Sequence, residues 1–354
     1  MSGNKKPDIR SLTRDELGVF LSSIGEKRFR TKQVYTWLWN KGCRSLEEMT
    51  NLPLSLRNQL TDAFAFEVIQ ETGRQQSRDG TIKFGYRLQD GTIIESVLIP
   101  SEERTTACIS SQAGCALGCT FCATATLGFY RNLTAAEIFD QVWKLNEASL
   151  EIHHIPLSNI VMMGMGEPLF NYPQVKRAVE LITGEEGLRI SPQRITLSTI
   201  GVPKVIRQLA DDQIKTHLAL SLHAATDAKR NRIIPFNQRY PLSELIEALT
   251  YYHHKTGKRF TIEYLLLKEF NDTLADARSF AEFCLNFPVK INLIEFNPVE
   301  GIDFQRSQMR RMKEFRDFLE SRNLVVNIRQ SRGKDIDAAC GQLAGRTRDV
   351  RRKT

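Results

Sequence analysis

Three cysteines, Cys115, Cys119 and Cys122, stand close together in a glycine-containing run of the chain. Thiolates at this C-x3-C-x2-C spacing can bind one face of a cubane iron–sulfur cluster and leave its fourth iron free for a small molecule. Structural zinc takes four ligands, and two-cluster ferredoxins use C-x2-C runs with a fourth cysteine, so neither fits well. Unligated thiols are a further alternative, but clustered cysteines at metal-binding spacing are seldom idle in a reduced compartment. The spacing therefore predicts an iron–sulfur site with one open iron.

The other four cysteines have different settings. Cys340 lies in a polar, glycine-flanked stretch beside charged residues, and reactive thiols are typically exposed in electropositive surroundings. Cys340 is therefore a candidate nucleophile. Cys284 is predicted to lie in a helix core, and Cys43 is predicted to be structural. Cys108 is open to either interpretation, because it has strand register and yet adjoins the cysteine run.

Strand-like and helical patterns alternate from residue 105 onward. Strands are predicted at 105–110, 159–164, 194–199, 216–222, 260–266 and 291–296. Helical patterns such as 134–147 and 242–255 lie between them, the first with a capping box from Thr134 to Glu137. Six βα units without a nucleotide-binding glycine fingerprint indicate a parallel barrel, complete or partial. Ligands of such barrels lie at the carboxyl ends of the strands.

Small and polar residues follow several of these strands. The segments are 164–168, 198–201, 221–223 and 295–298. Each motif alone is a weak signal, because a glycine-rich turn usually only reverses the chain. Together with the cysteine run they indicate a polar ligand at this end of the barrel.

A β-hairpin is predicted at 81–88 and 92–99, where alternating apolar residues flank Asp90 and Gly91. Glu95 stands inside the second strand among isoleucine, valine and leucine. The pattern favours a carboxylate that points to solvent. The alternative is a partly buried carboxylate that is poised to move a proton.

The two ends of the chain carry helical signals and clusters of basic residues. A helix is predicted at 11–24, with Thr13 and Glu16 as a capping box, and a helical pair broken by Pro53 at 46–66. Between them lie the cations Lys27, Arg28, Arg30 and Lys32 and the aromatic residues Tyr35, Trp37 and Trp39. One interpretation is that this module binds RNA phosphates through its basic turn. The other is that the turn is a solvated charged surface that packs on a core through its tryptophans, and the pattern favours neither. A basic amphipathic helix at 308–323 and a final strand at 324–329 precede the Cys340 loop and a basic tail from Arg346.

Four segments are predicted in this chain of 354 residues. They are a helical accessory module at 1–75, a β-hairpin extension at 76–104, a barrel at 105–300 and a C-terminal segment at 301–354 with a helix, a strand, the cysteine loop and the tail. The net charge of +8 favours a polyanion partner such as RNA. No apolar run reaches the ~18 residues that span a bilayer, and the N-terminus lacks a signal-peptide pattern. We therefore expect a cytoplasmic protein without a membrane partner.

The cysteine spacing resembles the radical S-adenosylmethionine (SAM) superfamily, in which the amino and carboxylate groups of SAM chelate the open iron. More specifically, residues 110–122, 128–133, 164–169, 197–199, 221–223 and 335–343 resemble the RlmN family. Members of that family are dual-specificity radical SAM methyltransferases that act on C2 of an adenosine in 23S rRNA and in some tRNAs. The resemblance covers nearly the whole chain and implies a partial (β/α)6 radical SAM barrel.

The resemblance also implies a role for each site residue. Cys115, Cys119 and Cys122 would bind a [4Fe-4S] cluster, and two SAM molecules would be used in each turnover. One SAM would methylate Cys340, and the second would yield the radical that carries this methyl carbon to the adenine. Glu95 would accept the C2 proton, and Cys108 would release the product through a transient disulfide with Cys340. The SAM-contacting positions would be Gly166, Glu167, Ser198, Ser221, Leu222, His223 and Asn297.

The expected partners are 23S rRNA at the peptidyl transferase centre, adenosine 37 of some tRNAs and an electron donor such as flavodoxin, with the protein itself a monomer. Two alternatives remain open on the sequence. One is the adenine-C8 methyltransferase branch that confers antibiotic resistance, which shares the cysteine set. The other is a non-catalytic RNA-binding protein with a structural zinc, in which Cys108 and Cys340 would be superfluous.

Overall fold

A ten-stranded sheet organises the protein, with strand order β1-β2-β3-β4-β7-β8-β9-β10-β11-β12. The computed structural model describes residues 6–345, so the basic tail from Arg346 lies outside the described residues. The parallel strands are β4 (Arg104–Cys108), β7 (Asn159–Met162), β8 (Ile195–Thr199), β9 (His217–Ser221), β10 (Phe260–Leu266), β11 (Val289–Glu295) and β12 (Val325–Arg329). The six predicted barrel strands are confirmed.

The structure adds β12 to this parallel set, whereas the sequence prediction treated 324–329 as a separate final strand. Helix α11 (Met309–Glu320) connects β11 to β12, so the chain makes the same strand–helix–strand crossover as in the preceding units. Such a crossover returns the chain parallel to the strand that it left. Pairing of Ile294 with Arg329 places the end of β12 beside the end of β11.

Three antiparallel strands extend the sheet next to β4. The hairpin prediction is confirmed by β2 (Ile82–Arg87) and β3 (Ile93–Ser101), which pair in a register that includes Gly85 with Glu95. Strand β1 (Gln70–Gln76) was not predicted, because its polar sequence carries no apolar alternation. It lies at the edge of the sheet and is mostly exposed, so it needs little apolar surface.

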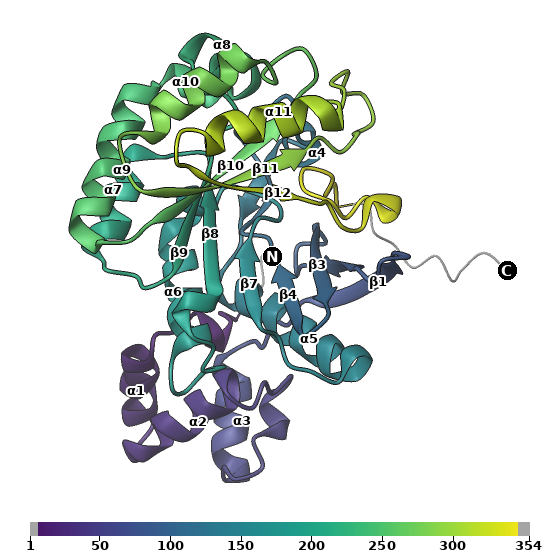
Figure 1. Ribbon diagram of the computed structural model, residues 1–354. Helices are drawn as coiled ribbons and strands as arrows, with labels where there is room; N and C mark the ends of the chain where they lie inside the picture. Colours follow the sequence, from purple (N-terminus) through teal and green to yellow (C-terminus); the bar gives the residue numbers. More distant parts are fainter. Residues whose placement is uncertain (1–5, 346–354) are drawn as a thin grey trace, which may run out of the picture.

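Helices cover the sheet between successive parallel strands (Figure 1). They are α5 (Ala135–His153), α6 (Tyr172–Thr183), α7 (Pro203–Asp211), α8 (Asp227–Ile233), α9 (Leu242–Thr256) and α10 (Leu274–Cys284). The predicted capping box starts α5: Glu137 N donates to Thr134 Oγ1 at 3.2 Å, and Thr134 N donates to Glu137 Oε2 at 2.9 Å. The cysteine loop follows β4 and carries the short helix α4 (Ala123–Thr126), flanked by the small two-stranded sheet of β5 (Gln112–Gly114) and β6 (Phe129–Asn132).

The N-terminal module contains α1 (Arg14–Ser23), α2 (Phe29–Trp39) and α3 (Leu54–Ala63) and lies below the sheet in Figure 1. Trp39 is fully buried and packs edge-on against Phe139 of α5, with ring centroids 5.0 Å apart. Arg10 Nη1 lies 2.6 Å from Asp140 Oδ1 of the same helix. Packing of the aromatic helix is therefore one part of the module's role, and its contact with RNA stays a prediction.

Candidate active site

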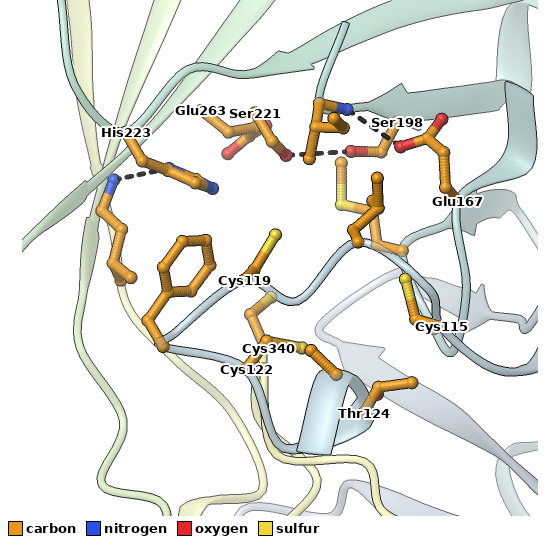
Figure 2. Close-up of a pocket in the computed structure, with 18 of the residues that line it drawn as sticks. Cys115, Cys119, Cys122, Thr124, Glu167, Ser198, Ser221, His223, Glu263 and Cys340 are labelled. Atoms are coloured by element: carbon orange, nitrogen blue, oxygen red, sulfur yellow. Dashed lines mark hydrogen bonds between the residues drawn. The ribbon is translucent and has the colours of Figure 1, made fainter. Parts of the chain in front are cut away.

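A cavity at the carboxyl ends of the parallel strands holds the three clustered cysteines. It is also lined by Gly166, Glu167, Ser198, Ser221, Glu263, His223, Arg329 and Cys340. Figure 2 shows the cysteine side chains across the cavity from a row formed by Glu167, Ser198, Ser221, Glu263 and His223. The structure therefore brings together residues that the sequence separates by more than 200 positions, as the barrel prediction requires.

The cysteine loop has a tight backbone, which a glycine makes possible. Gly114 has φ +74°, and a Cβ atom at this position would lie 2.0 Å from Gly128 O. Cys115 N donates a hydrogen bond to that same carbonyl at 2.8 Å. Burial raises the pKa of the Cys115 thiol to about 12 and that of Cys119 well above its ordinary value. Such thiols become thiolates readily only when a metal binds them.

The three thiols of the cysteine loop all line this cavity. Among the described residues 6–345, no three His, Cys, Asp or Glu side chains converge on a position for one metal ion. A structural zinc needs its donors around a single point. Three thiolates on a cubane bind three different irons, so they need not converge. This placement is compatible with a cubane cluster, which stays a prediction.

Glu167 lies opposite the cysteine loop and is held by two main-chain groups. Leu169 N donates to Oε1 and Ile200 N donates to Oε2, each at 3.0 Å. Burial raises the pKa of this carboxyl to about 7 in spite of these bonds. A cationic ligand group beside Glu167 would favour its ionised form.

The row continues along β8 and β9. Ser198 Oγ lies 3.4 Å from Ser221 Oγ on the neighbouring strand. His223 is buried, and burial lowers its pKa to about 3. Leu265 N donates to His223 Nδ1 at 3.0 Å, so the neutral ring carries its proton on Nε2. The row thus offers hydroxyl groups and a neutral imidazole to a polar ligand.

Two predicted ligand-binding residues do not line this cavity. The side chain of Leu222 is fully buried, and its N–H donates to Glu263 O at 3.0 Å. The side chain of Asn297 contacts the Cys340 loop, where its Nδ2 donates to Cys340 O at 3.3 Å. Its buried Oδ1 has no hydrogen-bond partner among the described residues. Asn297 therefore contacts the main chain of Cys340 and keeps one acceptor for another group.

A second cavity adjoins the first and contains Cys108. Cys340, Arg329, Met163, Ile294 and Leu343 line both cavities. Cys340 is exposed, whereas Cys108 at the end of β4 is buried. All seven cysteines lie in the described part of the chain and are free thiols. The structure thus places Cys340 between the cluster-type cysteines and Cys108.

The loop that carries Cys340 is fixed to both sides of the barrel opening. On the hairpin side, Gly333 N donates to Asp79 Oδ2 at 2.9 Å. On the side of the cysteine loop, Thr124 Oγ1 donates to Leu343 O and Ala123 N donates to Gly341 O, both at 2.7 Å. These bonds hold Cys340 over the cavity.

Glu95 is fully buried, so the prediction of a solvent-facing carboxylate from the strand pattern is wrong. Alternation separates core from solvent only where one face of a sheet is wet. Here β2 and β4 flank the strand, and the Cys340 loop covers it. Ala344 N donates to Glu95 Oε2 at 2.9 Å, and Lys83 Nζ lies 3.9 Å from Oε1. Glu95 borders the loop and lines neither cavity.

Sequence reasoning missed Glu263 and Arg329. Glu263 is buried in β10, where Asn292 Nδ2 donates to its Oε1 at 2.9 Å. Its Oε2 has no hydrogen-bond partner among the described residues and lies 4.0 Å from Arg329 Nη1. Two sequence signals could have found them: Glu263 is a charged residue within an apolar strand, and Arg329 is a cation at the end of another strand.

The fold and the site define the class as radical SAM proteins. Residues 109–281 match the radical SAM superfamily, and residues 7–65 match the N-terminal domain of ribosomal RNA large subunit methyltransferases. A radical SAM methyltransferase from Sphaerobacter thermophilus has the same fold, with a TM-score of 0.90 and 40% identity over 96% of this chain and 99% of that one.

Curated relatives narrow the class to one family. The probable dual-specificity RNA methyltransferase RlmN of Flavobacterium johnsoniae is 49% identical, over 98% of this chain and 99% of its own length. The dual-specificity RNA methyltransferase RlmN of Anaeromyxobacter dehalogenans is 44% identical, over 98% of this chain and 95% of its length. The chain belongs to the RlmN family of radical SAM RNA methyltransferases. Within residues 6–345, no helix has the length and apolar character required to cross a bilayer.

Proposed function

We propose that this enzyme methylates C2 of an adenosine in 23S rRNA and in some tRNAs, by way of a methyl group carried on Cys340. One observation supports this most directly: Cys340 lines both the cavity of the clustered cysteines and the cavity of Cys108. A thiol that only accepted a methyl group from SAM would need access to the first cavity alone. A thiol that is first methylated and then forms a disulfide with Cys108 needs access to both cavities.

We place both cofactors in the first cavity. Cys115, Cys119 and Cys122 would hold a [4Fe-4S] cluster, and Gly166, Glu167, Ser198, Ser221 and His223 would hold SAM. The expected SAM contacts of Leu222 and Asn297 would require the ligand to reach beyond the residues that line this cavity. Together the bound cluster and SAM supply a carbon radical, and SAM also supplies the methyl group, so two SAM molecules are used in each turnover. The Glu167 carboxylate suits the SAM amino group, because a nearby cation favours its ionised form.

Three residues of the chain would then carry the remaining steps. The exposed Cys340 thiol accepts the methyl group as a nucleophile. Glu95 takes the proton from C2 of the adenine, for which its place beside the Cys340 loop suits it. Cys108 attacks the Cys340 sulfur and forms a transient disulfide that frees the RNA.

RNA contact is assigned to the N-terminal module as part of this proposal. Lys27, Arg28 and Lys32 are exposed around the start of α2, and Phe29 between them is exposed as well. Cations of this kind bind phosphates, and an exposed ring can stack on a base. The proposal further places the reaction in the cytoplasm, with a monomeric enzyme and an electron donor of the flavodoxin type.

Anaerobic reconstitution with iron, sulfide, SAM, reductant and an RNA fragment tests the proposed function. Digestion of the RNA and mass spectrometry of the nucleosides should yield 2-methyladenosine from the wild-type enzyme and none from Cys340→Ala. The chromatographic position of the product separates the C2 from the C8 isomer. 8-Methyladenosine as the product would show that this chain acts as the resistance branch does.

A further inference from the structure

The first and last parallel strands approach one another at the open side of the barrel. Cys108 ends β4 and Arg329 ends β12, and the other parallel strands lie between these two in the sheet. Both residues nevertheless line the second cavity, together with Cys340. In Figure 1, the loop after β12 crosses from this strand toward the antiparallel extension at β3. The Arg329 cation and the thiols of Cys108 and Cys340 therefore line the same cavity.

The guanidinium of Arg329 has donors left over for an anion in that space. Among the described residues it donates one hydrogen bond, from Nη1 to Met163 Sδ at 3.7 Å, and thioether sulfur is a weak acceptor. Its ion-pair partner Glu263 is 4.0 Å away. The negative charges that Cys340, Glu263 and Cys108 can carry raise the pKa of Arg329, against the effect of burial. A guanidinium has five N–H groups, so most of them are not committed to these partners.

Cys108 is the thiol that most needs such a cation. It is 8% exposed, and burial raises its pKa to about 12, with the Cys340 charge adding to the rise and Arg329 opposing it. A thiol with that pKa is thiolate in roughly one molecule in 10⁵ at pH 7. Water can stabilise the thiolate of the exposed Cys340, but it reaches Cys108 poorly.

We propose that Arg329 is the positioning residue that stabilises the thiolate of Cys108 during release of the RNA. The inference rests on the proposed function. In this step the Cys108 thiolate forms an S–S bond with Cys340, and the bond between Cys340 sulfur and the methylene carbon on the adenine breaks. The electron pair stays on the carbon, which takes up a proton and becomes the methyl group. The two sulfurs are oxidised to a disulfide, and a dithiol reductant later restores both thiols.

Arg329→Gln tests this role because it removes the charge and keeps hydrogen-bonding groups. The variant should still load methyl on Cys340, as seen in the mass of the intact protein. It should also accumulate a nuclease-sensitive RNA adduct that survives denaturant and reductant, as Cys108→Ala is expected to do. Arg329→Lys keeps the charge and should release part of the adduct. Arg310→Gln is the matched control, since it removes the same charge from an 88% exposed site on α11.

Alkylation provides a readout that does not depend on turnover. Peptide mass spectrometry can follow the rate at which iodoacetamide modifies Cys108 as pH rises, with reconstituted wild-type enzyme and variants at intact cluster absorbance. The charged groups that act on Cys108 are Cys340 and Arg329, and Glu263 acts through Arg329. The exposed Arg332 also lines this cavity. An opposite charge nearby shifts a pKa by about 1–3 units, so Arg329→Gln should slow alkylation at neutral pH by about tenfold or more. Arg329→Lys should lie closer to wild type.

Three results would overturn the role of Arg329. They are multiple turnover by Arg329→Gln without an adduct, loss of methyl loading on Cys340 in that variant, and an unchanged alkylation profile for Cys108. The second result would mean that Arg329 supports methyl loading on Cys340 rather than release by Cys108. Failure of the proposed function looks different, because the wild-type enzyme itself would then make no methyladenosine.

Discussion

At the scale of single residues, burial depends on segments that lie far away in the sequence. Glu95 is the clearest case, since its sequence neighbours favour solvent and the fold encloses it. The strand pattern could not reveal this, because the covering segment comes from residues 333–344 at the far end of the chain. Cys284 is buried in its helix as predicted, and Cys43, which was predicted to be structural, is buried as well. Cys340 is exposed, as expected for a nucleophile.

Replacement of Glu95 by Gln tests its role as a base. Gln has the same shape and can still accept the Ala344 N–H, so the loop should stay in place. We expect normal methyl loading on Cys340 and normal SAM cleavage, with formation of methylated RNA slowed about 10²–10⁴-fold. Single-turnover assays with nucleoside mass spectrometry measure this. A rate within about threefold of wild type would return Glu95 to a structural role.

Glu167 should make the stability of the apoprotein depend on pH. Its folded pKa of about 7 lies above the ordinary value of 4.5, so the stabilising contribution is complete below about pH 4.5 and is lost as pH rises through 7. Between pH 5 and 8 the loss should amount to about 2–3 kcal/mol. Urea unfolding of wild type and Glu167→Gln at each pH isolates this contribution. Parallel pH dependences of the two proteins would contradict it.

At the scale of elements, short-range sequence signals predicted the helix starts, the hairpin and the barrel strands. The capping boxes at Thr13 and Thr134, the hairpin around Asp90 and Gly91 and the six barrel strands follow from turn chemistry and apolar periodicity. β1 escaped prediction because an edge strand can be polar. The resemblance implied that the Cys340 loop approaches Cys108. The contribution of β12 to the second cavity was not predicted, because its approach to β4 depends on curvature of the whole sheet.

The three cysteines of the cysteine loop are predicted to be the cluster ligands, which single substitutions can test. Replacement of Cys115, Cys119 or Cys122 by Ala, one at a time, should abolish cluster absorbance and SAM cleavage together, because each thiolate would bind a separate iron. Cys284→Ala is the matched control, since that thiol is buried in α10 away from the cavity. A ligand-position variant with full iron content and full cleavage activity would exclude that cysteine as a ligand.

At the scale of the whole molecule, the N-terminal module is fixed to the barrel rather than tethered to it. Arg177 of α6 donates to Ser11 O at 2.6 Å and to Arg10 O at 3.0 Å, and Arg10 pairs with Asp140 of α5. A rigid attachment would hold bound RNA at a constant position relative to Cys340. Whether the module binds RNA could not be decided from sequence, because exposed cations serve solubility as often as recognition.

Neutralisation of Lys27, Arg28 and Lys32 to Gln tests this assignment. RNA affinity should fall, and the slope of log affinity against log salt should decrease in magnitude by about 2, as three phosphate contacts predict. Methyl loading on Cys340 needs no RNA and should not change. Filter binding across a salt series measures the slope. If the slope equals that of wild type, these cations do not contact RNA and form only a solvated surface.

At the same scale, the proposed reaction depends on a covalent bond between Cys340 and the RNA, which Cys108 resolves. The most direct measurement is the state of Cys108→Ala after reaction with SAM, reductant and RNA. We predict one RNA per protein, stable to denaturant and reductant, released by nuclease and mapped by peptide mass spectrometry to a thioether on Cys340. Cys43→Ala serves as the control and should carry no RNA. If Cys108→Ala turns over repeatedly and carries no RNA, the resolving role of Cys108 is wrong.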